Sequence, residues 1–219
     1  MAALRVAVLA SGGGSNLQAL LDAAGDTEAR FSVVLVLSNR ADAGALERAA
    51  QAGVPTAVLK YDGQEEDRML SLLGDSRADL VVLAGYLKLV PPAVVSAYSG
   101  RMVNIHPALL PAFGGPGMYG RRVHEAVLGS GARVSGPTVH LVDEVFDHGR
   151  ILAQWPVPVA RDDTPETLAA RVLEAEHRLL PAVVRAWAAG GSAAALSLAA
   201  PAFGPSTDLP GDFDDALRR

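Results

Sequence analysis

Short and nearly continuous hydrophobic runs alternate with helical patterns over the first hundred residues of the chain. The runs lack the apolar–polar alternation of a half-exposed strand and are typical of strands buried on both faces. They cover residues 4–10, 31–37, 56–59, 80–84 and 102–105. The helical patterns between them cover residues 16–21, 45–52, 65–73 and 92–98. This alternation predicts an α/β protein with a Rossmann-like, mostly parallel twisted sheet and helices on both faces.

The pattern changes after the fifth run. Residues 107–120 contain three prolines and four glycines and predict an irregular loop folded onto the body. A helix is expected over 122–128. Two strands are then expected, over 134–142 and 151–159, and they are close enough in sequence to form an antiparallel extension of the sheet.

A long helix closes the predicted fold. Thr164 is a good N-cap and Pro165 suits the first helical position, so the helix is expected to run from there to about residue 188. Pro181 is expected to bend or interrupt it. We expect a single domain over residues 1–189, and a partly mobile C-terminal tail over 190–219, where small and polar residues dominate.

Composition narrows the class of protein. The 219 residues carry 19 basic and 24 acidic side chains, a net charge of −5, which argues against nucleic acid as a partner. Cysteine is absent, which excludes disulfide scaffolds and thiolate chemistry. The hydrophobic runs are far shorter than the roughly 18 residues of a membrane span, and no signal peptide is recognisable. A cytoplasmic protein without a membrane partner is the expectation.

The turn after the first strand is rich in glycine. Gly12, Gly13, Gly14 and Ser15 precede a helix, and such a loop lets backbone amides approach a phosphate closely. A Walker loop is excluded because no lysine is present, and the dinucleotide fingerprint fails at Leu17. A mononucleotide-type phosphate site is favoured, and a tight turn without a ligand is the alternative.

Two polar side chains end the fifth strand. Asn104 and His106 are two residues apart and should project to the same side, at the edge where open α/β sheets bind ligands. An amide beside an imidazole could stabilise an oxyanion and move a proton. In the acidic segment 143–149, one carboxylate could point back at His106 and favour its imidazolium form. Taken separately, a structural histidine and a solvated loop are the simpler interpretations.

The other histidines give weak signals. His124 is expected at the surface of a helix, His148 could be exposed or buried, and His177 lies late in the long helix. Because no helix carries a metal-binding spacing of histidine and acid, no metal is expected.

Taken together, the motifs resemble the phosphoribosylglycinamide formyltransferases of the folate-dependent formyltransferase family. Their order and spacing carry the resemblance over most of the chain. The matching segments are 11–18, 37–42, 79–86, 104–111, 136–142, 147–154 and 176–177.

This resemblance implies an enzyme of purine biosynthesis that transfers the formyl group of 10-formyltetrahydrofolate to the amine of glycinamide ribonucleotide. It implies direct attack of the amine through a tetrahedral intermediate. The implied catalytic residues are Asn104, His106 and Asp147. The implied nucleotide contacts are Gly12, Gly13, Gly14, Ser15 and Glu176. The implied folate contacts are Tyr86, Leu87, Lys88, Leu89, Val90 and Asn104.

Other activities stay open at this point. A formyltetrahydrofolate hydrolase shares the same chemistry, and a non-catalytic nucleotide-binding protein could use the same scaffold. Methionyl-tRNA formyltransferases and the deformylases carry added domains, which 219 residues are not expected to hold.

The oligomeric state is also open, with a homodimer as one option. Lys88 departs from the arginine that is common in the family, and it lacks the bidentate fork of that residue.

Overall fold

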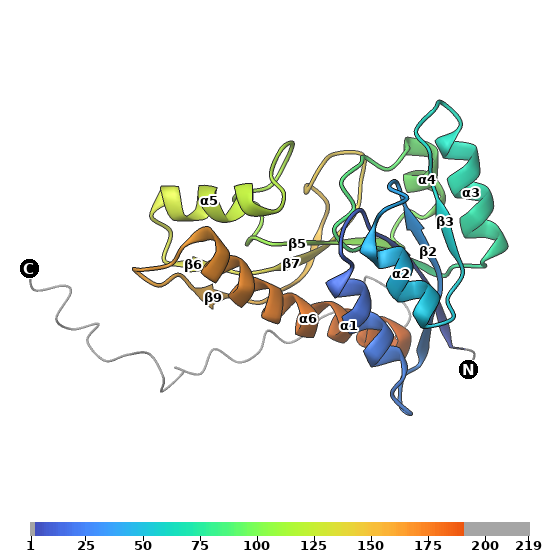
Figure 1. Ribbon diagram of the computed structural model, residues 1–219, viewed down its shortest axis with the longest axis horizontal. Helices are drawn as coiled ribbons and strands as arrows, with labels where there is room; N and C mark the ends of the chain where they lie inside the picture. Colours follow the sequence, from blue (N-terminus) through green and yellow to red (C-terminus); the bar gives the residue numbers. More distant parts are fainter. Residues whose placement is uncertain (1–2, 191–219) are drawn as a thin grey trace, which may run out of the picture.

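The computed structural model describes residues 3–190 and contains a seven-stranded sheet of order β3-β2-β1-β4-β5-β7-β8 (Figure 1). Its first five strands pair in parallel, and β7 and β8 add to the edge at β5 in antiparallel fashion. The strands are β1 Leu4–Leu9, β2 Phe31–Ser38, β3 Thr56–Val58, β4 Leu80–Leu83, β5 Met102–His106, β7 Thr138–Leu141 and β8 Ile151–Gln154. The predicted fold class is therefore confirmed.

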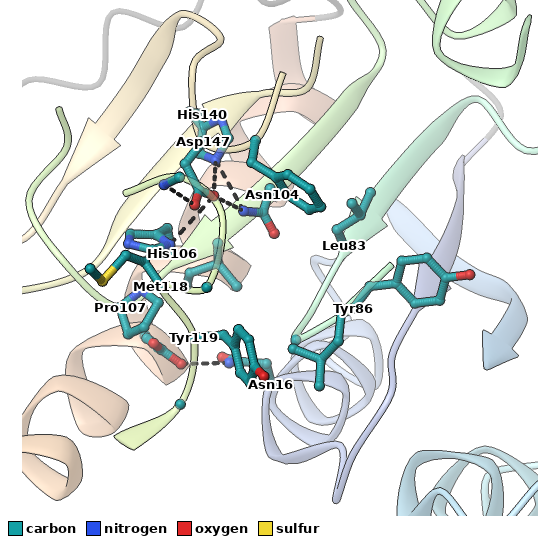
Figure 2. A pocket seen from close by; sticks show the side chains of 18 of the residues that line it. Asn16, Leu83, Tyr86, Asn104, His106, Pro107, Met118, Tyr119, His140 and Asp147 are labelled. Atoms are coloured by element: carbon teal, nitrogen blue, oxygen red, sulfur yellow. Dashed lines mark hydrogen bonds and ion pairs between the residues drawn. The ribbon is translucent and has the colours of Figure 1, made fainter. Parts of the chain in front are cut away.

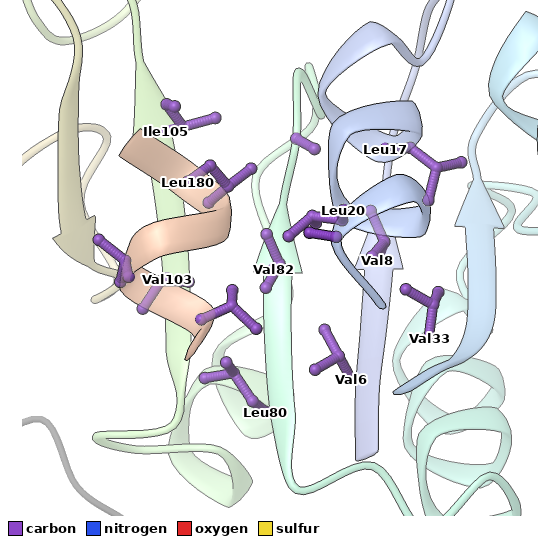
Figure 3. Close-up of a cluster of buried hydrophobic side chains, with 14 of the residues drawn as sticks. Val6, Val8, Leu17, Leu20, Val33, Leu80, Val82, Val103, Ile105 and Leu180 are labelled. Carbon is purple, nitrogen blue, oxygen red and sulfur yellow. The ribbon is translucent and has the colours of Figure 1, made fainter. Parts of the chain in front are cut away.

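Helices cover both faces of this sheet. The helices are α1 Ser15–Ala24, α2 Gly44–Gln51, α3 Glu65–Asp75, α4 Pro92–Ala97, α5 Arg121–Ser130 and α6 Pro165–Gly190. Side chains of α1, α2 and α6 share one buried cluster with the sheet, and those of α3 and α4 share the other. Figure 3 shows Val8 and Val82 facing Leu20, and Val103 close to Leu180. Continuous apolar strands thus fill two cores at once, as predicted from their lack of alternation.

The antiparallel region differs from the prediction. Each of the two predicted strands is divided, and the outer pieces, β6 Val134–Ser135 and β9 Val157–Pro158, form a separate two-stranded sheet. The division falls at Gly136, whose φ is +138° and where a Cβ would overlap the Trp155 carbonyl. Prolines follow directly, at Pro137 and Pro156, and cannot donate to a ladder.

Helix α6 continues through Pro181, so the interruption allowed for there is wrong, while a bend at Pro181 stays a prediction. Pro181 and its neighbours Leu180 and Val183 are buried, and this packing holds the helix across the lost backbone hydrogen bond. The predicted tail lies outside the described residues, apart from Gly190. Over residues 3–190, no helix has the length and hydrophobicity needed to cross a lipid bilayer.

Candidate active site

A cavity of about 500 Å³ opens at the carboxyl ends of β4 and β5. Leu83 and Asn104 contribute to its floor, and the loops 115–121 and 143–147 form further walls. This is the edge at which open parallel sheets bind their ligands, because strand ends and connecting loops leave a crevice there. Most of the predicted site residues reach this cavity.

Four polar side chains meet in the cavity wall, with one carboxylate at their centre (Figure 2). The Oδ1 atom of Asp147 lies 3.4 Å from Nδ1 of His106, 3.3 Å from Nδ2 of Asn104 and 3.7 Å from Nε2 of His140. The His106, His140 and Asp147 side chains are only 4%, 3% and 10% exposed. The structure therefore brings together the three residues expected from separate motifs, and adds His140.

The backbone around Asp147 aims this carboxylate inward. Asp147 has a φ of +54°, and the amide of Gly115 donates to its Oδ2 at 2.9 Å. Burial by itself would raise the pKa of Asp147, but contacts with His106 and His140 and the Gly115 amide outweigh it and lower the pKa below its usual range. Asp147 is therefore an ionised acceptor at neutral pH.

Both ring nitrogens of His106 face acceptors. Nδ1 faces the Asp147 carboxylate, and Nε2 lies 2.9 Å from the carbonyl oxygen of Phe113. Since neither oxygen can donate, this arrangement suits an imidazolium with a proton on each nitrogen. The Phe113 carbonyl belongs to the loop expected to fold onto the body, and Phe113 itself has a φ of +57°.

Asn104 is oriented by its two partners. Nδ1 of His140 donates to the Leu141 carbonyl at 2.8 Å and fixes the ring, whose Nε2 lies 3.0 Å from Nδ2 of Asn104. The second amide hydrogen of Asn104 points to Asp147. Figure 2 accordingly shows the amide oxygen of Asn104 directed away from Asp147. Sequence reasoning expected an amide donor toward substrate, whereas in this arrangement the oxygen faces outward.

The turn after β5 is fixed from the antiparallel strands. The hydroxyl of Thr138 donates to the carbonyl of Ala108 at 2.6 Å and accepts from the amide of Leu110 at 3.0 Å. Gln154 donates to the Leu110 carbonyl at 2.9 Å. These bonds attach the segment that follows His106 to β7 and β8, so the strands that carry His140 also set the course of the loop that carries Phe113.

A buried acid lies on another side of the cavity. Glu176 of α6 is 7% exposed and accepts from Nδ2 of Asn16 at 2.6 Å, a contact drawn in Figure 2. Burial raises the pKa of Glu176, while Asn16 and the charge of His106 act in the opposite direction. Asn16 was not singled out by sequence reasoning, although it directly follows the predicted phosphate loop.

The glycine loop lies beside the cavity. Gly14 has a φ of +75°, and a Cβ there would come within 2.7 Å of Ala45 at the start of α2. Gly12 and Gly13 are exposed with open space around them, so packing does not require glycine at these two positions. Of the loop and the helix start, Asn16 lines the cavity, while Ser15 faces a separate cleft between α1 and α6.

The segment from Tyr86 to Val90 lines the cavity opposite the histidines. Ser11 holds its beginning, because its hydroxyl accepts from the amide of Leu87 at 2.9 Å and donates to Asn39 at 2.5 Å. Leu87, Lys88 and Leu89 are exposed, unlike the histidine cluster. An exposed apolar pair with a cation between is suited to a ligand that is partly flat and partly anionic.

The remaining histidines differ in burial, and one of them is not where the sequence predicted. His124 was expected at the surface but is 4% exposed and lines the cavity, and burial and the nearby His106 lower its pKa. His148 is exposed and pairs with Asp143 at 2.8 Å, and His177 is half-buried. His140 was missed, although its place two residues after Thr138 on a strand facing β5 was a usable signal. Over residues 3–190, no three histidine or acidic side chains gather as a metal site would require.

Comparisons with known proteins match this architecture. Residues 4–184 match the formyl transferase family. The chain is 48% identical over 188 residues to a chloroplastic phosphoribosylglycinamide formyltransferase from Arabidopsis thaliana, covering 83% of this chain but only 64% of that relative. It is 42% identical over 193 residues to the phosphoribosylglycinamide formyltransferase of Escherichia coli, covering 86% of this chain and 88% of that one.

Solved structures agree. The phosphoribosylglycinamide formyltransferase of Brucella melitensis superposes with a TM-score of 0.79 at 44% identity, covering 86% of this chain and 97% of that one. Fold and site thus define an α/β protein with a histidine–carboxylate cluster at the carboxyl edge of a parallel sheet. Within that class, the chain belongs to the formyl transferase family.

Proposed function

We propose that this protein transfers the formyl group of 10-formyltetrahydrofolate to the amine of glycinamide ribonucleotide, a step of purine biosynthesis. The observation that carries the proposal is the convergence of Asn104 and His106 on one carboxylate oxygen of Asp147 in the cavity wall. Membership of the formyl transferase family and the names of the Arabidopsis and E. coli relatives support the same reaction.

In the proposed reaction, the substrate amine attacks the formyl carbon and forms a tetrahedral intermediate with a negative oxygen. His106, held as an imidazolium by Asp147, delivers a proton to the folate nitrogen as its bond to the formyl carbon breaks. The attacking amine loses one proton, which returns to His106, so protons balance over the cycle. General acid–base assistance of this kind contributes roughly 10² to 10⁴ in rate.

Two contacts of the present arrangement must change for this chemistry. Nε2 of His106 is occupied by the Phe113 carbonyl, so the loop has to release it before a proton can reach substrate. Nδ2 of Asn104 is 3.3 Å from Asp147 and 3.0 Å from His140. The hydrogen that faces Asp147 has the longer contact, so it is the one that we expect to turn to a developing oxyanion. Once it has left Asp147, an amide donor to the oxyanion contributes about 10² to 10³ in rate.

The two substrates are assigned to different parts of the site. The backbone amides at Gly12 to Ser15 and the start of α1 suit the ribonucleotide phosphate, and Glu176 suits its sugar hydroxyls. The segment from Tyr86 to Val90, with Lys88, suits the folate. The predicted cytoplasmic location and the option of a homodimer stay predictions.

The hydrolase alternative shares this fold. A formyltetrahydrofolate deformylase from Pseudomonas syringae superposes with a TM-score of 0.77, but at 26% identity and with 62% of that chain covered. The decisive experiment follows loss of 10-formyltetrahydrofolate with and without glycinamide ribonucleotide. We expect loss only when both substrates are present. Loss without the ribonucleotide would favour the hydrolase, and no loss in either case would contradict an enzymatic function.

A further inference from the structure

A tyrosine outside the cavity contacts three positions of one cavity wall, Tyr86, Lys88 and Leu89. Tyr61 lies in the connection between β3 and α3 and does not line the cavity. Its hydroxyl meets the hydroxyl of Tyr86 at 2.8 Å and donates to the carbonyl of Leu89 at 3.3 Å. The ammonium of Lys88 lies over its ring, 5.4 Å from the centroid.

These contacts act on a segment whose middle residues, Leu87, Lys88 and Leu89, are exposed. Ser11 holds Leu87 near the start of the segment, and Tyr61 holds Leu89 near its end. Tyr86 is 7% exposed, and Figure 2 shows its hydroxyl pointing away from the histidine cluster. The Tyr61 hydroxyl meets it there and therefore braces the segment from behind.

The ring of Tyr61 also places a charge. Lys88 is exposed and has four rotatable bonds, so its ammonium would otherwise sample a wide volume. A cation over an aromatic face is attracted by the ring quadrupole. Burial raises the pKa of Tyr61, so the phenol stays neutral and its hydroxyl keeps a proton to donate at neutral pH.

We propose that Tyr61 is a positioning residue for the folate-binding wall, setting the course of Tyr86 to Leu89 through its hydroxyl and the site of the Lys88 ammonium through its ring. This inference rests on the proposed function and names a residue outside the cavity that tunes affinity for one of the two substrates. The proposed ribonucleotide contacts, Gly12 to Ser15 and Glu176, are not among these partners of Tyr61. Tyr61 is therefore expected to affect the binding of the folate and not of the ribonucleotide.

The test compares Tyr61→Phe with the unaltered protein and with a matched control, Tyr98→Phe. Tyr98 also carries a cation over its ring, Arg101 at 4.8 Å, but it does not line the cavity, and its ring cation is not Lys88. Calorimetry measures Kd for tetrahydrofolate and, separately, for glycinamide ribonucleotide. Loss of the two hydroxyl contacts is expected to weaken tetrahydrofolate binding about three- to tenfold. Ribonucleotide binding is expected to stay within about twofold, as are both affinities of Tyr98→Phe.

A second comparison isolates the ring. Tyr61→Leu should weaken tetrahydrofolate binding about two- to fivefold further than Tyr61→Phe, because the aromatic ring beneath the Lys88 ammonium is lost as well. That extra loss should disappear when Lys88→Gln is already present, which a merely structural role would not produce.

The outcomes separate the two proposals. If the unaltered protein binds no tetrahydrofolate, both the function and this inference are overturned. If it binds, and Tyr61→Phe binds equally well or loses affinity for both ligands alike, the inference alone is overturned.

Discussion

The two walls of the cavity are built from different kinds of contact. One wall is enclosed, and its side chains are joined by hydrogen bonds and ion pairs: His106, His140, Asn104 and Asp147. On the other side, Leu87 to Leu89 are exposed and held from behind by Ser11 and Tyr61. Enclosed charges interact strongly and need fixed partners, whereas an exposed wall can accept a ligand. Changes on the enclosed wall should therefore appear in kcat, and changes on the exposed wall in KM.

The largest effect is expected on the enclosed wall, at the proposed proton donor. His106→Ala should lower kcat by about 10² to 10⁴, because general acid–base assistance is lost. The KM for 10-formyltetrahydrofolate should change little. Steady-state kinetics on folded variant protein checks this, and near-full turnover would show that His106 does not move the proton.

Asp147→Asn removes the charge that holds His106. A hydrogen bond to a charged group is worth about 1.5 to 3 kcal/mol, so kcat should fall roughly 10- to 100-fold. Stability gives a second readout. The pKa of Asp147 is lowered in the folded protein, so the carboxylate stabilises the fold above an unfolded-state pKa near 3.9, and this stabilisation is lost as the pH falls further. The difference in Tm between the unaltered protein and the Asp147→Asn variant should therefore shrink below about pH 4, and a constant difference would contradict the assignment.

Glu176 belongs to neither wall, and it tests whether the burial of an acid in the cavity favours ligand binding over stability. Its pKa is raised in the folded protein, so ionisation opposes folding as the pH rises above the ordinary glutamate value of about 4.3. Glu176→Gln should therefore gain Tm relative to the unaltered protein as the pH rises above about 4.3. Its Kd for the ribonucleotide should rise about tenfold, because a charged acceptor is lost. A fall in Tm across that pH range would contradict this account.

The smallest effect is expected on the exposed wall. Lys88→Ala should raise the KM for 10-formyltetrahydrofolate about two- to fivefold with kcat unchanged, since an exposed ion contact contributes about 0.2 to 1 kcal/mol. The effect should weaken at high salt. Lys88→Arg is the matched control and should keep the KM within about twofold. A change in kcat in either variant would show that the exposed wall does not act on binding alone.

Sequence predicted the parallel half of the fold well, because each buried strand is a local apolar run such as Leu80–Leu83. It predicted the antiparallel part less well, since the break at Gly136 depends on a close approach to Trp155, far along the chain. In the same way, the pattern around Asn104 and His106 was readable, but the contact with Asp147 was only one option. The burial of His124 and the contacts of Tyr61 arise from tertiary neighbours, which no local pattern contains.

Whether the protein is a transferase is decided by following the formyl carbon itself. The unaltered protein is mixed with glycinamide ribonucleotide and 10-formyltetrahydrofolate labelled with carbon-13 in the formyl group, and the products are read by NMR. We expect the label to move to the ribonucleotide amine, with one labelled product formed for each molecule of donor consumed. Label recovered as free formate, with the ribonucleotide unchanged, would contradict it.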